Sequence, residues 1–99
     1  MWGGNKWIRH MTRAEFEAEL RRDGFEIAPG EIKPNEERGE HAHDFEVRGL
    51  VLDGEFALTC DGRRQDFRAG DVFTMPAGRR HSEQAGPAGI RYVVGRRHQ

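Results

Sequence analysis

Residues 70–81 are Gly70-Asp71-Val72-Phe73-Thr74-Met75-Pro76-Ala77-Gly78-Arg79-Arg80-His81, a short apolar segment between two turn signals, followed by a histidine. Similar turn signals recur at strand-length intervals from Phe25 onward, and hydrophobicity between them alternates with a period of two. These further signals are Pro29-Gly30, Pro34-Asn35, Asp53-Gly54, Asp61-Gly62 and Gly86-Pro87. The pattern predicts many short antiparallel strands and therefore an all-β fold, either a sandwich or a small barrel.

The strongest hairpin signal is Asp53-Gly54. It lies between the apolar segment 49–52 and the alternating segment 55–59. A two-residue type I′ turn needs positive φ at both central positions, which Asp and Gly tolerate. We therefore predict that segments 49–52 and 55–59 form the two strands of a β-hairpin.

A capping box, Thr12-Arg13-Ala14-Glu15, precedes the strands. The Thr12 hydroxyl can accept a hydrogen bond from the backbone N–H of Glu15, while the Glu15 carboxylate accepts one from the N–H of Thr12. Phe16 and Leu20 lie four residues apart and therefore share one face of a helix. The sequence predicts one short helix over residues 12–23 that packs against the side of the strands.

The length of 99 residues allows a single domain. We assign residues 12–99 to this domain, with the strands at about residues 25–95. Residues 1–11 show no clean hydrophobic period and are interpreted as a tail, either disordered or preceding a native start at Met11.

The charge balance excludes a general nucleic-acid binder. Sixteen Lys and Arg residues face 17 Asp and Glu, whereas such a domain carries a clear basic excess. The longest aliphatic run, Leu50-Val51-Leu52, is far shorter than the roughly 20 apolar residues of a membrane span, and residues 1–11 lack the apolar stretch of a secretory signal. The single cysteine, Cys60, agrees with a reducing compartment. We therefore expect a soluble, cytoplasmic protein without nucleic-acid or membrane partners.

Two of the five histidines, His41 and His43, stand two residues apart within the segment 40–47. Residues i and i+2 of a strand point to the same side, so the two imidazoles would lie next to each other. That spacing suits two neighbouring positions on a metal ion. A surface strand can carry the same pattern by chance, so the pair alone leaves both interpretations open.

Residues 70–81 also fit the pattern G-x5-P-x-G-x2-H, and they follow His41 and His43 by the length of two strands with their turns. The two segments together resemble the paired motifs of the cupin superfamily over roughly residues 35–85. The resemblance implies a small antiparallel jelly-roll β-barrel in which His41, His43 and His81 meet. It also implies a bound divalent transition metal, and because imidazole binds many such ions, Zn, Fe, Ni, Mn and Cu all remain candidates.

The sequence departs from the cupin pattern where that pattern has a glutamate, because this position is Val47. Val47 would instead form an apolar wall of the pocket. Glu46 is adjacent, but strand alternation directs it away from His41 and His43, so it becomes a fourth ligand only if a bulge reverses the alternation. The expected site is therefore three neutral imidazoles, with water or substrate in the remaining metal positions.

Arg79 and Arg80 directly precede His81, so we expect them near the barrel mouth, where they could steer an anionic substrate. The resemblance implies a metal-binding protein that acts on or binds a small polar or anionic metabolite, as an oxygenase, isomerase or lyase. The absent glutamate leaves a second hypothesis open, in which an empty or metal-free cavity binds or senses a small molecule without catalysis.

A homodimer is also expected. Only 35% of the residues are apolar, which limits the core that one chain can build. Cupins often associate through sheet faces, and Leu50, Leu52 and Phe56 offer apolar side chains beyond what one small core needs.

Overall fold

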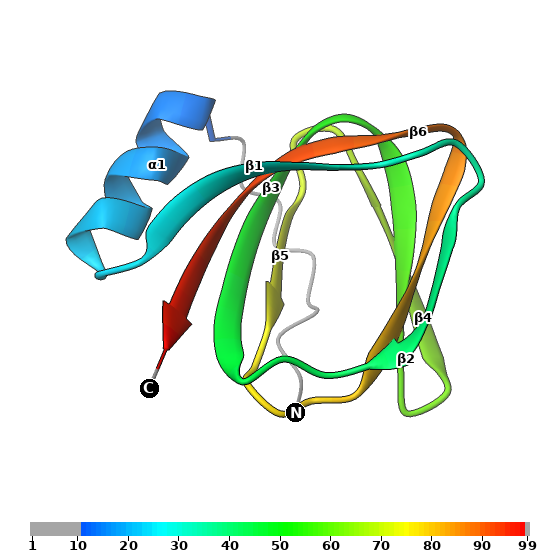
Figure 1. Ribbon diagram of the computed structural model, residues 1–99. Coiled ribbons are helices and arrows are strands. Elements are labelled where there is room, and N and C mark those ends of the chain that lie inside the picture. The colour runs from blue at the N-terminus through cyan, green and yellow to red at the C-terminus, as the bar shows by residue number, and fades with distance from the viewer. Residues whose placement is uncertain (1–10, 99) are drawn as a thin grey trace.

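The computed structural model describes residues 11–98, so residues 1–10 of the tail interpreted above lie outside the described part. Within this described part, one helix and six strands follow one another (Figure 1). They are α1 (Arg13–Arg22), β1 (Glu26–Ile32), β2 (Glu37–His41), β3 (Phe45–Cys60), β4 (Arg63–Arg68), β5 (Val72–Met75) and β6 (His81–His98). Between residues 11 and 98, no helix has the length and apolar character that crossing a membrane requires.

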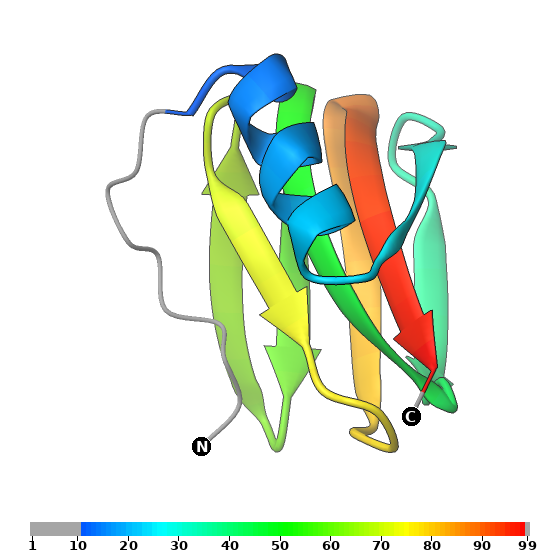
Figure 2. The same ribbon diagram turned by 90° about the vertical axis from the view of Figure 1, so that its left-hand side faces the viewer.

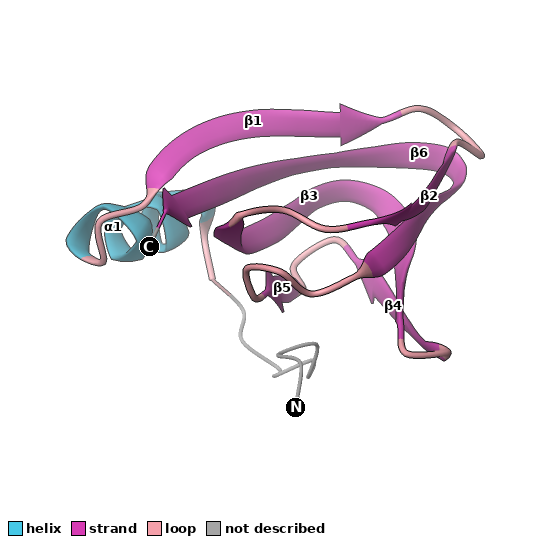
Figure 3. Ribbon diagram, turned by 60° about the horizontal axis from the view of Figure 1, so that its bottom comes forward, coloured by secondary structure: helices cyan, strands magenta, loops and turns pink. Residues whose placement is uncertain are grey.

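The long strands β3 and β6 pair with each other along most of their length. The first half of β3 and the second half of β6 continue sideways into β5 and β1, while their other halves continue into β4 and β2. All pairs are antiparallel, and the strands curve around a common interior (Figure 3). The path β1-β6-β3-β4 does not close on itself among the described strands, but the expected class is confirmed: an all-β jelly roll with a short N-terminal helix.

The predicted hairpin at Asp53-Gly54 is wrong, because β3 continues through both residues. The ladder between β3 and β6 shifts register just before Asp53 and just after Gly54, so the dipeptide lies between two bulges at which β3 bends. Gly54 has a φ of +80°, and a Cβ there would collide with the carbonyl oxygen of Gly89 on β6. A bulge glycine and a type I′ turn both need positive φ, so one dipeptide serves either structure.

Two more predicted turns, Pro29-Gly30 and Gly86-Pro87, also lie within strands. Residues 86–89 of β6 bulge outward opposite a single residue of β3, at the bend described above. The turns at Pro34-Asn35 and Asp61-Gly62 are present as predicted. The strands β1, β3 and β6 are therefore longer than the turn signals indicate.

The helix α1 begins at the predicted capping box. The Thr12 hydroxyl accepts a hydrogen bond of 3.1 Å from the N–H of Glu15, whose carboxylate accepts one of 2.9 Å from the N–H of Thr12. The chain turns away at Gly24, which has a φ of +80°. Phe16 and Leu20 are buried against the outer face of β3 and β6, so α1 covers that face of the sheet (Figure 2).

The main core lies between the curved strands, and a smaller cluster lies beneath α1. The main core includes an aromatic group in which the Phe56 ring lies 5.6 Å from that of Phe67 and 5.1 Å from that of Phe73. Phe56 is 3% exposed, and Leu50, in the smaller cluster, is 2% exposed. These two residues are therefore buried within one chain, and the expectation that they form a dimer surface is wrong.

Candidate metal centre

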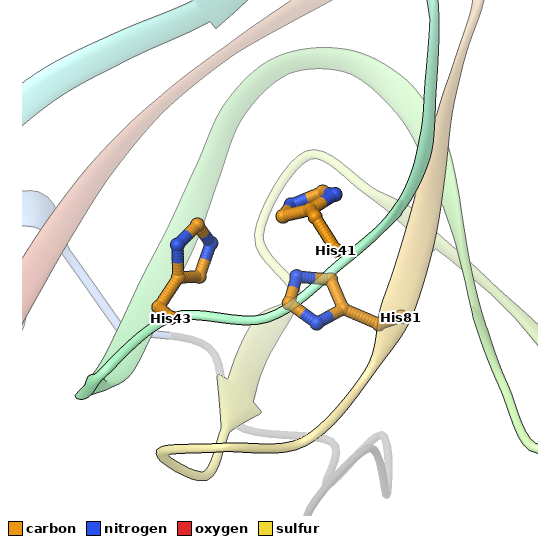
Figure 4. A group of neighbouring side chains, drawn as sticks. All are labelled: His41, His43 and His81. Atoms are coloured by element: carbon orange, nitrogen blue, oxygen red, sulfur yellow. The ribbon is translucent and has the colours of Figure 1, made fainter.

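Three histidines come together at one end of the jelly roll, with their rings pointing toward one another (Figure 4). His41 is the last residue of β2, His43 lies in the connection to β3, and His81 is the first residue of β6. The antiparallel ladder between β2 and β6 pairs His41 directly with His81. Strand register thus unites two segments that are distant in the sequence.

The geometry of the three rings fits one transition-metal ion. The ring centroid of His81 lies 4.4 Å from that of His41 and 5.3 Å from that of His43, and the centroids of His41 and His43 are 5.0 Å apart. One nitrogen of each ring lies within 4.8 Å of a nitrogen of each other ring. Because imidazole nitrogens bind Zn at about 2.0–2.1 Å, ligand nitrogens on one ion lie roughly 3–4 Å apart, so nitrogens within 4.8 Å of one another are close to that spacing.

Backbone hydrogen bonds hold two of the rings in the tautomer that leaves Nε2 available to a metal. The Nδ1 atom of His41 lies 2.7 Å from the carbonyl oxygen of Gly39, and the Nδ1 atom of His81 lies 2.8 Å from that of Arg79. A carbonyl oxygen only accepts hydrogen bonds, so each Nδ1 carries a proton and donates it. The Nε2 atom of each neutral ring then offers a lone pair, as a metal ligand requires.

His43 is held in its neutral form by its surroundings. Burial is the largest cause that lowers the pKa of its imidazole, and the neighbouring His41 and His81 lower this pKa further. Arg96 acts in the same direction. The His43 ring stacks on Phe45 with a centroid distance of 4.7 Å. The His43 ring is therefore suited to bind a metal ion in place of a proton.

The histidines line a cavity of about 110 Å³ inside the jelly roll. Half of its lining residues are apolar side chains of β3, β5 and β6, and Val47 is among them. Four polar residues share the cavity with the histidines: Arg38, Glu83, Tyr92 and Arg96. The volume is well below the roughly 300–1,000 Å³ of pockets for drug-sized ligands, so it suits a molecule of few atoms.

Tyr92 has its place in the cavity because β1 leaves room for it. Its direct partner across the ladder is Gly30, and a Cβ on Gly30 would collide with the Tyr92 ring. Burial is the largest cause that raises the pKa of the Tyr92 hydroxyl, and the negative charge of Glu83 raises it further. The hydroxyl therefore keeps its proton at neutral pH and can donate a hydrogen bond into the cavity.

Glu46, considered above as a fourth ligand, lies outside the histidine group. Its carboxylate accepts a hydrogen bond of 2.8 Å from Arg97, on the side of β3 that strand alternation predicts for it. Arg80 pairs with Glu40 at 2.8 Å. Neither Glu46 nor Arg80 is among the residues that line the cavity.

Arg79 is likewise not one of the residues that line the cavity. Its guanidinium lies 3.1 Å from the Sγ atom of Cys60 and 3.1 Å from the carboxylate of Asp61. The positively charged side chains that line the cavity are instead those of Arg38 and Arg96.

Sequence reasoning missed the four polar residues of the cavity. Glu83 follows His81 by two positions on β6, so strand alternation alone places both on one side. Tyr92 and Arg96 also share a side, but the bulge at residues 86–89 hides their relation to His81. Arg38 was not predictable from alternation, because the ladder of β2 shifts register between Arg38 and His41.

Comparisons with known proteins agree with this fold. The cupin domain family matches residues 25–86. Dimethylsulfoniopropionate lyase DddW of Ruegeria pomeroyi is 31% identical over 80 residues, which cover 74% of this chain and 53% of the lyase, so the chain spans about half the length of that relative. The polyketide cyclase RemF of Streptomyces resistomycificus superposes with a TM-score of 0.64 at 28% identity, covering 77% of this chain and 58% of the cyclase.

A protein of unknown function from Rhizobium leguminosarum has a TM-score of 0.72 at 18% identity, and the match covers 94% of this chain and 99% of that protein. At this identity the likeness concerns the fold alone. The family match extends over more than half of the chain, from β1 to the middle of β6, and includes all three histidines. The chain therefore belongs to the cupin family.

Proposed function

We propose that this protein holds one divalent transition metal on His41, His43 and His81 and acts on a small carboxylate-bearing metabolite in the adjoining cavity. The observation that carries the proposal is the convergence of three imidazoles, two of which have Nδ1 engaged by a backbone carbonyl. Such bonds leave Nε2 of each ring free to bind a metal. A bound metal with open positions supplies a Lewis acid that polarises a substrate oxygen.

The cationic side chains of the cavity support an anionic ligand. The Arg96 guanidinium lies 5.2 Å from the centre of the Phe45 ring, and within residues 11–98 it forms no salt bridge. Arg38 already donates to the Glu36 carboxylate and to the carbonyl of Glu31. Because a guanidinium pairs well with a carboxylate in bidentate geometry, Arg96 is the residue that would bind the carboxylate of a ligand.

Among the possible reactions, a lyase is favoured by the similarity to dimethylsulfoniopropionate lyase. That relative acts on a small carboxylate, which agrees in size with a cavity of about 110 Å³. In this proposal Arg96 binds the carboxylate and Tyr92 donates a hydrogen bond to the bound molecule. A ligand-binding protein without turnover is the second candidate, because the same cavity would serve it.

Metal content tests the proposed centre. Protein purified without a histidine tag is expected to contain about one equivalent of transition metal by elemental analysis, and the His43→Ala variant is expected to lose it. His98→Ala is the matched control, since His98 is an exposed histidine at the end of β6 and is expected to leave metal content unchanged. The proposal fails if neither protein holds metal and if added Zn, Fe, Ni or Mn leaves the melting temperature unchanged.

Carboxylate binding tests the role of Arg96. Binding of propionate to the metal-loaded protein, followed by NMR titration, is expected to weaken roughly tenfold or more in Arg96→Ala, because a hydrogen bond to a charged group contributes about 1.5–3 kcal/mol. Arg91→Ala is the control, since Arg91 of β6 is exposed and pairs with Asp53. If Arg96→Ala and Arg91→Ala bind propionate with equal affinity, Arg96 does not bind the carboxylate of the ligand.

Turnover distinguishes the two candidates. Metal-loaded protein is expected to consume dimethylsulfoniopropionate, measured by proton NMR, while the His43→Ala variant is inactive. Binding of this carboxylate without its consumption would favour the non-catalytic candidate.

A further inference from the structure

We propose that Glu83 is the carboxylate ligand of the metal centre and binds the same ion as His41, His43 and His81. The inference rests on the proposed metal site. It adds a metal ligand at residue 83 of β6, a position at which the cupin motif that ends in His81 has no ligand. Its consequence is a site of three neutral donors and one negative donor in place of a purely neutral set.

The position of Glu83 directs its side chain to the histidines. It follows His81 by two residues on β6, so both side chains extend from the same side of the strand. Its ladder partner on β2 is Arg38, three residues before His41. The Glu83 side chain is only 12% exposed and lines the cavity together with the three histidines.

Glu83 lies outside the group of histidine nitrogens that are within 4.8 Å of one another, but its contact with His41 suits two ligands on one cation. The Oε1 atom of Glu83 lies 3.3 Å from the Nε2 atom of His41. Because Nδ1 of His41 donates to Gly39, the neutral ring presents a lone pair at Nε2, and a carboxylate oxygen presents a second one. Two lone pairs at this distance repel each other, and a cation between them converts the repulsion into attraction.

The separation of 3.3 Å also agrees with a shared metal ion. Two donor atoms that each lie about 2.0–2.2 Å from one ion, in neighbouring positions, are roughly 3–3.5 Å apart. Alternatively the shared cation is a proton, in which case Glu83 only orients the His41 ring. The two cases differ in whether a metal–oxygen bond forms, and that difference can be measured.

The carboxylate of Glu46 already forms a hydrogen bond outside the cavity. Glu46, adjacent to Val47 in the sequence, accepts a hydrogen bond from Arg97 on the opposite side of β3. Arg38 lies across the ladder from Glu83 but directs its Nε donor to Glu36. Since buried charges are stable only when paired or bound to metal, Glu83 is the carboxylate of this cavity available to a cation.

Cobalt binding provides the test. Purified metal-free protein is titrated with Co²⁺ at pH 7.5 by calorimetry, and the visible spectrum is recorded at saturation, for wild type, Glu83→Ala and Glu46→Ala. Glu83→Ala is expected to bind Co²⁺ about 10- to 100-fold more weakly and to show shifted d–d bands, whereas Glu46→Ala matches wild type in both. The conservative variant Glu83→Gln, which preserves side-chain volume, keeps the test valid if Glu83→Ala does not fold.

The outcomes separate this inference from the metal site on which it rests. If wild type binds no Co²⁺, the three-histidine centre itself is refuted. If wild type binds and His43→Ala does not, but the Glu83 variants have an unchanged spectrum at saturation, Glu83 is not a ligand, whether or not affinity falls. A changed spectrum in the Glu83 variants, with wild-type behaviour in Glu46→Ala, supports the proposed ligand.

Discussion

Replacing Gly54 by alanine is expected to lower the free energy of unfolding by about 3 kcal/mol or more. An L-residue at positive φ costs roughly 1–2 kcal/mol, and here the added Cβ also meets the backbone carbonyl oxygen of Gly89, which no rotamer change can move. Thermal unfolding followed by circular dichroism would show the effect as a fall in melting temperature of more than about 12 °C.

Gly62→Ala is the matched control for this prediction. Gly62 has a φ of +75°, close to the +80° of Gly54, but no atom lies within 4 Å of the Cβ that alanine would add. The control therefore carries the conformational cost alone, about 1–2 kcal/mol. Equal losses of stability in the two variants would contradict the view that β3 and β6 touch at the bend.

Lowering the pH from 7.5 to 5 is expected to release the bound metal. Protons compete with the metal for imidazole nitrogens, and imidazole has an ordinary pKa of about 6.5, so we expect affinity to fall on the order of 100-fold or more. Equilibrium dialysis at a series of pH values, with metal measured in both compartments, checks this result. Metal retained unchanged near pH 4 would mean that residues other than histidines hold it.

The metal-free protein is expected to lose stability over the same interval. The pKa of His43 is lowered in the folded state, chiefly by burial, so between pH 6.5 and that lower value the unfolded chain binds more protons. The contribution of His43 to the stability of the folded state is thus fully present above pH 6.5, and it is lost as the pH falls through the lowered pKa. In denaturant titrations at a series of pH values, His43→Ala should reduce the change in the free energy of unfolding with pH. If this change is the same as in wild type, the lowered pKa of His43 is not its cause.

The local features of the fold were predictable because their causes are local. The capping box at Thr12 and Glu15 forms within one helical turn, and its hydrogen bonds are those expected from residue types and spacing. The grouping of the histidines was predictable from motif resemblance. Strand alternation was also sufficient to place Glu46 on the side of β3 away from the histidines.

Features that depend on distant contacts were not predictable. Asp53-Gly54 satisfies the backbone requirement of a turn and of a bulge equally, and only the pairing of β3 with β6 decides between them. The apolar residues Leu50 and Phe56 gave no sign of which partner would bury them: α1 lies over the first, while the aromatic core encloses the second. Both features are decided by contacts with segments that are distant in the sequence.

The central place of β6 has a consequence for how the chain is synthesised. Among the described strands, β1 and β2 form hydrogen bonds with β6 and no other strand, although residues 26–41 are made long before residues 81–98. During translation, β1 and β2 lack their partner strand until β6 has been made. Their unpaired backbone groups can then form hydrogen bonds with other nascent chains. The pairing of β1 and β2 must therefore follow the translation of β6, and with the slow rate typical of non-local topologies this protein should benefit from chaperones that protect incomplete sheets.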